Sequence, residues 1–526
     1  MAAVEQQHEP QTCPQPLSQL LAGLAVQLPD VDPVINKVSF DSRRVRPGDL
    51  YIGLPGTRSH GAAFAEAARD LGAVALLTDE RGAELARDQG LPMAVCTDLR
   101  LAMAIAAARI WGHPARRMTS FGVTGTNGKS TTVLMLAAAL DAAAHRVGSI
   151  GTLGFLVGGQ PVEVEHSTIT TPESPDLQAI IATLAARGAD VLAMEVSSHA
   201  LSLNRVTGIG FDVVGFTNLG RDHLEFHHTM EAYYQAKAQL FTPGYAKRAV
   251  INADDESGRR LLAQAAELGL PAASVGMAED CDYRIVAWRP RDQGSTFTLL
   301  HDRVAIEAFT CLPGEYNVRN AATALAMIDQ AGYEVTAALP GLATAVIPGR
   351  MQPVPLEGAD APHVYVDFAH TPQAIASALS AFSHPGFADR RVIAVFGAGG
   401  DRDPDKRELM GQAGVGGADL VVVTDDNPRS EDPAAIRARV LAGARGAIAS
   451  AAPGSHAAAV EVLDGGDRAS AITQALRLAH PGDAVVILGK GHERTQQLAD
   501  KTIDFDDLSA AQDSWTQIIQ TPGGRS

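Results

Sequence analysis

The sequence predicts an α/β protein made of three domains. The chain has 526 residues, too many for one ordinary hydrophobic core, and corresponds to about three domains of roughly 150 residues each. Hydrophobic residues make up 46% of the chain and charged residues 20%, as in folded globular proteins. Short apolar runs alternate with helical, alanine-rich segments over most of the length, which indicates strands separated by helices.

The first predicted domain covers residues 1–115. After a polar amino-terminal segment, β-like runs at 49–54, 73–78 and 93–96 are separated by alanine-rich helical segments. A Trp-Gly-His-Pro sequence at 111–114 would break a helix and therefore marks the end of this small α/β unit.

The second predicted domain, residues 116–347, repeats strand, turn and helix more regularly. Apolar runs at 118–124, 191–196, 211–216 and 249–251 end in polar clusters and are bounded by helical patterns. This arrangement is typical of a parallel sheet buried on both faces. Four prolines in residues 346–363 then predict a linker.

The third predicted domain, residues 348–526, is Rossmann-like. Strands are expected at 392–396, 420–424 and 484–488, and each runs directly into a polar or glycine-rich cluster: GAGGDRD, DDNPRS and GKGHE. Ligands bind beyond the carboxyl ends of the strands in open parallel sheets. The three clusters therefore predict a binding site of their own.

Charge and cysteine content exclude several classes of protein. A formal net charge of −17 argues against broad nucleic-acid binding, which needs a basic surface, although phosphorylated small molecules remain compatible. The four cysteines are far apart without a CxxC spacing, so neither a disulfide framework nor a zinc site is expected. Neither a signal peptide nor a membrane span is recognisable, and we expect a cytoplasmic protein without membrane insertion.

A phosphate-binding loop is predicted between the strand at 118–124 and the helix that starts near residue 130. Its sequence, Gly125, Thr126, Asn127, Gly128, Lys129 and Ser130, can wrap backbone amides around phosphate oxygens at a helix N-terminus. Lys129 would reach the β and γ phosphates of a nucleotide, and Ser130 would bind Mg²⁺. Val123 stands where the strict Walker pattern has glycine. The alternative interpretation, a glycine turn that only starts a helix, accounts less well for the strand–loop–helix context.

Acidic and histidine side chains follow two further strands of this domain. Glu195 ends a strand, as does the acidic residue that faces Mg²⁺ in other nucleotide hydrolases, and Ser197 to His199 follow it. The next strand leads to Asn218, Asp222 and His223. The histidines could indicate zinc, but a hard divalent ion at the phosphates fits this set better. Lys237, taken as a plain lysine in a helix, is expected on the surface.

Nine short motifs together resemble the Mur ligase family. In chain order they are TGTNGKST, MEVSSHAL, FTNLGRDHLEFH, EYNVRN, PGRM, DFAHTP, GGDRD, DNPR and GKGHE, and the resemblance covers nearly the whole chain, roughly residues 38–500. Within that family the set is similar to members that add meso-2,6-diaminopimelate to UDP-N-acetylmuramoyl-L-alanyl-D-glutamate.

The resemblance implies a catalytic centre with two Mg²⁺ ions. Lys237 matches the family lysine that becomes carbamylated, which turns a cation into an anionic oxygen ligand. The implied metal ligands are Ser130, Glu195, His223 and the Lys237 carbamate, and the implied catalytic residues are Lys129, Glu195, His223 and Lys237.

The resemblance also implies contacts to the nucleotide and to the nucleotide-sugar. Besides the loop, the ATP contacts would be Asn317, Asn320, Arg350, Asp367 and His370. The UDP-muramyl-dipeptide contacts would be Phe40, Ser42, Thr57, Arg58, Ser59, Thr170, Thr171, Ser197 and Arg205. Two positions depart from the family pattern: Ile169 replaces a frequent asparagine, and Leu203 stands where some relatives carry glutamine.

Selection of the amine substrate is implied to rest on the DNPR sequence. The matching residues are Arg402, Asp426, Asn427, Pro428, Arg429, Gly489 and Glu493. Arg429 can bind a carboxylate through two hydrogen bonds, and diaminopimelate carries a distal carboxylate that lysine lacks. Glu493 suits the distal ammonium group.

The implied function is an ATP-dependent ligase of peptidoglycan precursor synthesis that forms an amide through an acyl phosphate. We expect it to act as a monomer. The alternatives are the same reaction with L-lysine, a folylpolyglutamate-type synthase, an NTPase switch that makes no ligated product, and a non-catalytic homologue. The SFDSR segment and DNPR argue against the synthase, and the retained Lys129, Glu195, His223 and Lys237 argue against the non-catalytic homologue.

Overall fold

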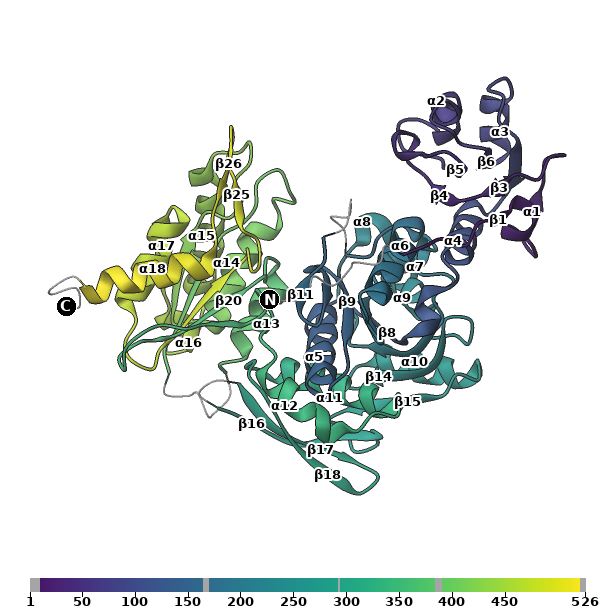
Figure 1. The fold of residues 1–526 in the computed structure, drawn as a ribbon. Helices are drawn as coiled ribbons and strands as arrows, with labels where there is room; N and C mark the ends of the chain where they lie inside the picture. Colours follow the sequence, from purple (N-terminus) through teal and green to yellow (C-terminus); the bar gives the residue numbers. More distant parts are fainter. Residues whose placement is uncertain (1–9, 164–169, 292–293, 384–389, 521–526) are drawn as a thin grey trace, which may run out of the picture. The chain divides into compact units, whose positions relative to one another are not determined.

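The computed structural model describes residues 10–163, 170–291, 294–383 and 390–520 (Figure 1). The chain divides into two compact units. One consists of Met1–Ile285, Leu300–Val304 and Arg319–Leu342, and the other of Val286–Leu299, Ala305–Val318 and Ala343–Ser526. The predicted α/β class is confirmed, whereas the boundaries expected near residues 115 and 347 remain predictions.

A five-stranded sheet lies in the amino-terminal part of the first unit. Its order is β2 (Val26–Gln27), β7 (Met93–Cys96), β6 (Ala75–Thr78), β5 (Asp49–Gly53) and β4 (Lys37–Ser39). All neighbouring strands are parallel except β2 and β7. Leu50 and Ile52 of β5 pack with α4 (Leu99–Ile110) on one face, while Tyr51 packs with α2 (Ala65–Asp70) and α3 (Glu80–Ala86) on the other.

Short elements surround this sheet. They are β1 (Gln15–Pro16), α1 (Leu17–Leu20), β3 (Val34–Ile35), η1 (Ser42–Arg44), η2 (Gly61–Phe64) and η3 (Pro114–Arg117). The predicted strands near 49–54, 73–78 and 93–96 are all present. The β2 and β4 strands were not predicted, because two or three residues are too few to show an alternating pattern.

The second sheet has eleven strands. Their order is β11 (Gln160–Pro161), β10 (Gly154–Val157), β9 (Val147–Gly151), β12 (Val191–Glu195), β8 (Thr119–Thr124), β13 (Phe211–Phe216), β14 (Ala246–Asn252), β15 (Ala272–Gly276), β16 (Tyr283–Pro290), β17 (Ser295–His301) and β18 (Val304–Thr310). The run from β9 to β16 is parallel. The carboxyl ends of β12, β8 and β13 therefore lie next to one another.

Helices connect and cover these strands. They are α5 (Lys129–Ala142), α6 (Ser174–Ala186), α7 (Ser198–Ser202), α8 (Leu224–His227), α9 (Met230–Ala238), α10 (Glu256–Glu267), α11 (Glu315–Gln330) and α12 (Val335–Thr344). Side-chain oxygens cap the N-termini of several of these helices. Thr229 accepts a hydrogen bond from Ala232 N at the start of α9, and Asp255 accepts one from Gly258 N at the start of α10.

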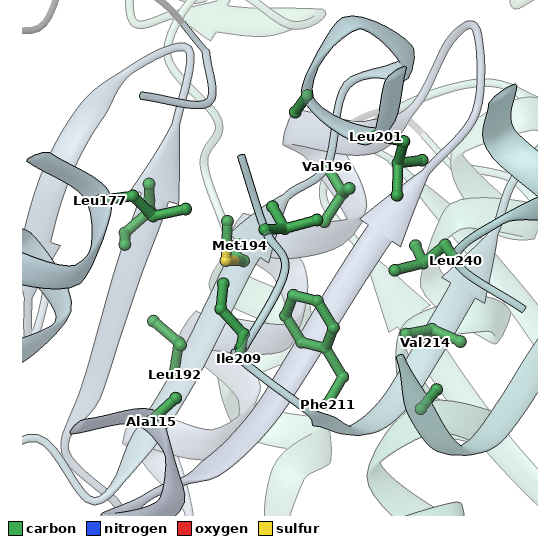
Figure 2. Close-up of a cluster of buried hydrophobic side chains, with 14 of the residues drawn as sticks. Ala115, Leu177, Leu192, Met194, Val196, Leu201, Ile209, Phe211, Val214 and Leu240 are labelled. Carbon is green, nitrogen blue, oxygen red and sulfur yellow. The ribbon is translucent and has the colours of Figure 1, made fainter. Parts of the chain in front are cut away.

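The core on one face of the central strands is close-packed and apolar. Leu192, Met194 and Val196 from β12 and its end meet Phe211 and Val214 of β13 (Figure 2). Each of these side chains is at most 1% exposed to solvent. Such burial stabilises each large side chain by about 1.5–3 kcal/mol and fixes the strand ends that carry the polar clusters.

A six-stranded sheet forms the framework of the carboxyl-terminal part. Its order is β19 (Gln352–Val354), β20 (His363–Asp367), β24 (Ala484–Leu488), β21 (Val392–Phe396), β22 (Leu420–Thr424) and β23 (Glu461–Gly466). All pairs are parallel except β19 with β20. The strands predicted at 392–396, 420–424 and 484–488 are found at those residues.

Both faces of this sheet are covered by helices, as expected of a Rossmann-like fold. Val392, Ala394 and Phe396 pack in one core with α13 (Pro372–Ser380), α14 (Lys406–Gly417) and α15 (Pro433–Ser450). Ile393 and Val395 pack in the other with α17 (Arg468–Leu478) and α18 (Asp507–Gln520). The unit also contains α16 (His456–Ala459) and a hairpin of β25 (Thr495–Gln497) and β26 (Thr502–Asp504).

The predicted linker at 346–363 is not a bare connection. It contains β19, which pairs with β20, and the Glu357 carbonyl accepts a hydrogen bond of 2.7 Å from Trp515 Nε1. Proline is tolerated in a strand at the edge of a sheet, so part of the segment forms β19, and the domain boundary expected there stays a prediction. Among the described residues, none of the helices combines the length and apolar character needed to cross a membrane. All four cysteines are free.

Candidate functional site

The predicted phosphate loop joins the end of β8 to the start of α5. Gly125 has φ +152° and Gly128 φ +86°, conformations that favour glycine. A β-carbon at Gly125 would collide with Thr217 Oγ1, and one at Gly128 would collide with Asn320 Oδ1. The two glycines therefore permit both the tight turn and the close approach of two neighbouring segments.

The segment after β13 supports this loop. Asn218 accepts a hydrogen bond of 3.0 Å from Asn127 N and donates one of 3.1 Å to Asn127 O. Thr217 Oγ1 donates to Asn127 O at 2.6 Å, and Gly220 N donates to Thr126 Oγ1 at 2.9 Å. The sequence singled out Asn218 only as part of a polar cluster and missed Thr217, since neither type is diagnostic of a loop-supporting role.

Two lysines converge on one carbonyl of the loop. Lys129 Nζ donates to Gly125 O at 3.0 Å and to Thr126 O at 2.9 Å. Lys237 Nζ donates to the same Gly125 O at 2.7 Å and lies 4.5 Å from the centre of the Tyr233 ring. Lys237 is only 2% exposed, so the expectation of a surface lysine was wrong. Burial and the charge of Lys129 hold the pKa of Lys237 well below its ordinary value.

Glu195 lies at the end of β12, directly beside the strand that leads into the loop. It is 2% exposed, and its register partner on β8 is Val123. Thr152 holds the carboxylate through its backbone N, 2.8 Å from Oε1, and its hydroxyl, 3.2 Å from Oε2. A β-carbon at Gly151 would collide with this carboxylate. Thr152 was not predicted, because it precedes Glu195 by more than forty residues and carries no motif.

The predicted His223 belongs to a group of aromatic side chains. It begins α8 with φ +52°, and its ring lies edge-on to His199 at 4.9 Å. His227, 7% exposed, shares a hydrogen bond of 2.9 Å with Ser198 Oγ. Burial, reinforced by His199 and His223, lowers the pKa of His227 to about 4, and burial likewise lowers the pKa of His199. Among these histidines, His227 is therefore held neutral near pH 7.

The donor set suits a hard divalent cation. Ser130 is buried in the first turn of α5, and the Glu195 carboxylate ends the adjacent strand, so both offer the oxygen ligands that Mg²⁺ prefers. The residues described by the structure contain no cluster of three or more His, Cys, Asp or Glu side chains arranged to hold a metal ion. The expected ligands include only two residues of those types, Glu195 and His223.

Residues expected to contact the sugar–peptide substrate gather near Glu195. Thr171 Oγ1 donates to Glu195 O at 3.0 Å and accepts from Ser197 N at 3.2 Å. Thr170 and Thr152 share a hydrogen bond of 3.2 Å between their hydroxyls. Arg205 donates to Thr171 O at 3.1 Å. The structure therefore brings all four predicted residues together, while Ile169 lies outside the described residues.

Glu173 fixes the orientation of Arg205. Its Oε1 accepts from Arg205 Nε and Nη2 at 3.1 and 2.8 Å, and its Oε2 accepts from Arg100 Nη1 of α4 at 3.0 Å. Glu173 was not predicted as a site residue, because one glutamate among sixty acidic residues gives no signal in the sequence.

The residues expected to contact uridine follow parallel strands of the five-stranded sheet. Phe40 and Ser42 come after β4, and Thr57, Arg58 and Ser59 come after the adjacent β5. Thr57 to Ser59 are exposed, whereas Phe40 packs partly against the core. Both groups thus lie where ligands bind in open parallel sheets.

Two asparagines of the predicted nucleotide site lie on the first turns of α11. Asn320 is 6% exposed and lies against Gly128 of the phosphate loop. Asn317, 2% exposed, donates from Nδ2 to Pro313 O at 2.8 Å. Between them, Arg319 donates from Nε to Asp254 Oδ2 at 2.7 Å.

Three further predicted nucleotide contacts belong to the second unit. The Asp367 carboxylate accepts from Met351 N at 2.7 Å and from Ala369 N at 2.8 Å, and burial raises its pKa. The Arg350 guanidinium lies 4.7 Å from the centre of the Phe368 ring. His370 Nδ1 is 2.9 Å from Phe368 O. Asp367 and His370 thus lie at the end of β20, and Arg350, just before the antiparallel partner strand β19, packs against the same segment.

The three clusters predicted at strand ends of the second unit converge. Gly400 N donates to Asn427 O at 2.9 Å, and Asn427 Nδ2 donates to Glu493 Oε2 at 3.1 Å. Arg429 has φ +51° and donates from Nη1 to Gly400 O at 2.7 Å. The β24, β21 and β22 strands are neighbours, so their loops share one edge of the sheet.

The remaining predicted residues lie in the same loops. Asp426 is 9% exposed, and its Oδ1 has no hydrogen-bond partner among the described residues. Gly489 has φ +117° and lies near Asp426 and the buried Arg468. Arg402 is exposed in the first loop, and Pro428 separates Asn427 from Arg429. Carboxylate, carboxamide and guanidinium groups here can bind a ligand that carries both ammonium and carboxylate groups.

Three family models match the chain. They are "Mur ligase family, catalytic domain" over residues 34–109, "Mur ligase middle domain" over 123–328, and "Mur ligase, glutamate ligase domain" over 349–491. Together they take in the phosphate loop, Glu195, Lys237 and the first two converging loops, and the last match ends within the third loop.

Relatives and a solved structure agree with these matches. The chain is 44% identical over 494 residues to the UDP-N-acetylmuramoyl-L-alanyl-D-glutamate--2,6-diaminopimelate ligase of Streptomyces coelicolor, with 94% of each chain covered. It is 42% identical over 515 residues to the protein of the same name from Streptomyces avermitilis, with 97% of each covered. A solved structure of that name has a TM-score of 0.68 and 30% identity, covering 93% of this chain and 96% of that chain.

Proposed function

Because this chain belongs to the Mur ligase family, we propose that it is an ATP-dependent ligase that joins meso-2,6-diaminopimelate to UDP-N-acetylmuramoyl-L-alanyl-D-glutamate. The new amide forms at the D-glutamate, in peptidoglycan precursor synthesis. One observation carries the proposal most directly: the phosphate loop has two lysines on one carbonyl, Gly125 O, beside a buried glutamate. This site suits the transfer of a phosphoryl group.

The first chemical step makes an acyl phosphate. An oxygen of the D-glutamyl γ-carboxylate attacks the γ-phosphorus of ATP, the bond from that phosphorus to the β-phosphate oxygen breaks, and ADP leaves. Lys129 lies over the loop and stabilises the charge on the phosphoryl oxygens. Two Mg²⁺ ions, held by Ser130, Glu195, His223 and carbamylated Lys237, would supply further charge neutralisation when bound.

The second step makes the amide. The amine of diaminopimelate attacks the acyl carbon, the carbon–oxygen bond to phosphate breaks, and the amine loses a proton. The loops that contain Arg402, Asp426 to Arg429, Gly489 and Glu493 bind and orient this amine. Thr170, Thr171, Ser197 and Arg205 orient the acid, and Phe40, Ser42 and residues 57–59 bind its uridine end.

The surroundings of Lys237 support its carbamylation. A lysine must be neutral to attack carbon dioxide, and burial beside Lys129 lowers the pKa of Lys237 well below its ordinary value. The carbamate would exchange one of two converging cations for an anion and so balance the charge of the site.

We further propose that the domains are residues 1–115, 116–347 and 348–526, and that Asn317, Asn320, Arg350, Asp367 and His370 contact ATP. The enzyme acts as a monomer in the cytoplasm, where ATP and nucleotide-sugars are available. Arg429 favours diaminopimelate over L-lysine as the acceptor, because a guanidinium fork pairs with a carboxylate.

Phosphate release from ATP tests this function. The enzyme is given UDP-N-acetylmuramoyl-L-alanyl-D-glutamate with diaminopimelate, with L-lysine, or with no amine. We expect fast release with diaminopimelate only, matched by a product that has gained one diaminopimelate by mass. Preference for lysine would favour the alternative acceptor. Release that needs neither amine nor nucleotide-sugar would instead identify an NTPase switch.

A further inference from the structure

A fully buried lysine belongs to one of the three loops that we assign to the amine substrate. Lys490, in the turn after β24, is 0% exposed. Its Nζ lies 3.3 Å from Asn427 Oδ1 and 3.3 Å from Glu493 Oε2. Lysine is rarely buried to this extent unless its charge is paired. Both of its side-chain partners belong to the proposed amine site, so its charge acts on that site.

Asn427 and Glu493 do not depend on Lys490 alone for their partners. Asn427 Oδ1 also accepts from Gln497 N at 3.0 Å, and Asn427 Nδ2 donates to Glu493 Oε2 at 3.1 Å. The lysine adds a cationic donor to two oxygens, Asn427 Oδ1 and Glu493 Oε2, that each already accept from a neutral N–H group. Both contacts of the Glu493 carboxylate fall on Oε2, which fixes the direction in which Oε1 points.

Gln497 holds Arg429 in a comparable way. It is the last residue of β25, and its Oε1 accepts from Arg429 Nε at 2.9 Å. Its carbonyl accepts from Arg429 N at 3.1 Å, at a residue with φ +51°. With Arg429 Nη1 bound to Gly400 O at 2.7 Å, the guanidinium is held at two of its nitrogens. Its orientation is therefore set before any ligand binds.

These contacts form one continuous chain of hydrogen bonds. It runs from Glu493 to Lys490, from Lys490 to Asn427, from Asn427 to Gln497 and from Gln497 to Arg429. The ends of the chain are a carboxylate and a guanidinium. A ligand with an ammonium and a carboxylate on one carbon needs such a pair at a fixed separation.

We infer that Lys490 and Gln497 are positioning residues for the amine substrate, with Lys490 orienting Glu493 and Gln497 orienting Arg429. Together they set the preference for an acceptor that carries both a distal ammonium and a distal carboxylate. This inference rests on the proposed function. It assigns no substrate contact to either residue, because each acts through the side chain that it holds.

Two variants test the inference. Lys490→Met keeps the length of the side chain and removes its charge, and the remaining partners of Asn427 and Glu493 persist. Gln497→Ala removes the acceptor for Arg429 Nε at an exposed position. In each variant we expect the KM for diaminopimelate to rise about tenfold or more, because a small misplacement of binding groups is costly. The KM for ATP should change by less than about twofold, because neither substitution removes a group that is expected to bind the nucleotide.

Matched controls carry the same substitutions outside the site. Lys501→Met changes an exposed lysine beside β26, and Gln512→Ala changes a half-buried glutamine of α18 whose side chain donates to Pro355 O. Both should retain the parent KM values. Thermal unfolding of every variant distinguishes a variant that no longer folds from one in which only Glu493 or Arg429 is misplaced. If Lys490→Met does not fold, Gln497→Ala alone decides the matter.

The preference for diaminopimelate over L-lysine gives a second measurement. It should fall in Gln497→Ala, since lysine lacks the distal carboxylate and loses less when Arg429 is misaligned. In Lys490→Met the KM for lysine should rise together with that for diaminopimelate, because both amines carry the distal ammonium that Glu493 binds. Unchanged KM values and preference would overturn the inference, as would equal rises in the KM for ATP and for diaminopimelate. If the parent enzyme itself releases no phosphate in response to diaminopimelate, the proposed function fails instead.

Discussion

At the scale of single residues, the surroundings of Lys237 change its chemistry strongly. It is almost fully buried, shares Gly125 O with Lys129 and lies over the Tyr233 ring. Burial also raises the pKa of Tyr233 to about 12, so that ring remains neutral. A buried ammonium beside another lysine is unfavourable, whereas a neutral amine or its carbamate is accommodated.

Replacing Lys237 with Ala should lower kcat by at least about 10²-fold, the cost of removing a group that stabilises transition-state charge. Added acetate or formate should restore part of the activity, because a small carboxylate can take the place of the carbamate. Turnover measured with and without the acid checks this expectation.

Lys247→Ala is the matched control for this experiment. Lys247 is exposed and pairs with Asp212 at 2.6 Å. It should retain parent activity and show no response to added acid. Parent-level turnover in the Lys237 variant would show that catalysis does not need a carbamate at this position.

The sequence identified individual residues when they belonged to an ordered motif. Lys129, Glu195 and the DNPR residues were singled out because they follow predicted strands or glycines. The structure places Glu195 at the end of β12, the DNPR residues just after β22, and Lys129 at the start of α5. Lys237 was expected on the surface until the family resemblance was considered, because nothing local distinguishes a buried lysine from an exposed one. Thr152, Glu173, Lys490 and Gln497 were missed because they act through partners distant in sequence.

At the scale of elements, the strand–loop–helix formed by β8, the loop and α5 requires glycine at a defined position. Gly128 has φ +86° and faces Asn320, so an added methyl group would strain the backbone and displace that asparagine. Gly269 offers a comparison within the same unit: its φ is +73°, and nothing would lie within 4 Å of an added β-carbon.

Substituting Ala at each glycine separates these two effects. Both Gly128→Ala and Gly269→Ala should lower the free energy of unfolding by about 1–2 kcal/mol, the cost of a left-handed backbone in a non-glycine residue. Gly128→Ala alone should raise the KM for ATP, by about tenfold for a loss of about 1.4 kcal/mol of binding. Denaturant unfolding and steady-state kinetics measure the two quantities. Equal KM values for ATP in the two variants would show that the contact between residue 128 and Asn320 does not contribute to ATP binding.

Strands were predicted well where they are buried on both faces and less well elsewhere. The runs at 392–396, 420–424 and 484–488 match β21, β22 and β24, because an unbroken apolar run of five residues suits a central parallel strand. The predictions missed β23 and β16 to β18, in which exposed and partly buried residues are frequent. The β19 strand was not predicted, because it contains a proline.

At the scale of the whole molecule, each unit carries a recognisable part of one reaction. The first holds the phosphate loop, Glu195 and Lys237, and the second holds the loops with Arg429 and Glu493. Length and composition predicted three domains, and three family models match successive parts of the chain. By contacts the chain forms two compact units, and the amino-terminal and central segments within the first share packing such as the Arg100–Glu173 ion pair at 3.0 Å. Composition does not report such contacts.

The central claim is that the carboxylate of the acid substrate becomes an acyl phosphate. It is tested by labelling both oxygens of the D-glutamyl γ-carboxylate with ¹⁸O and examining the phosphate released during turnover with diaminopimelate. The account predicts that each phosphate carries one ¹⁸O atom and that the amide retains the other. Phosphate that contains no ¹⁸O, formed while the amide accumulates, would contradict it.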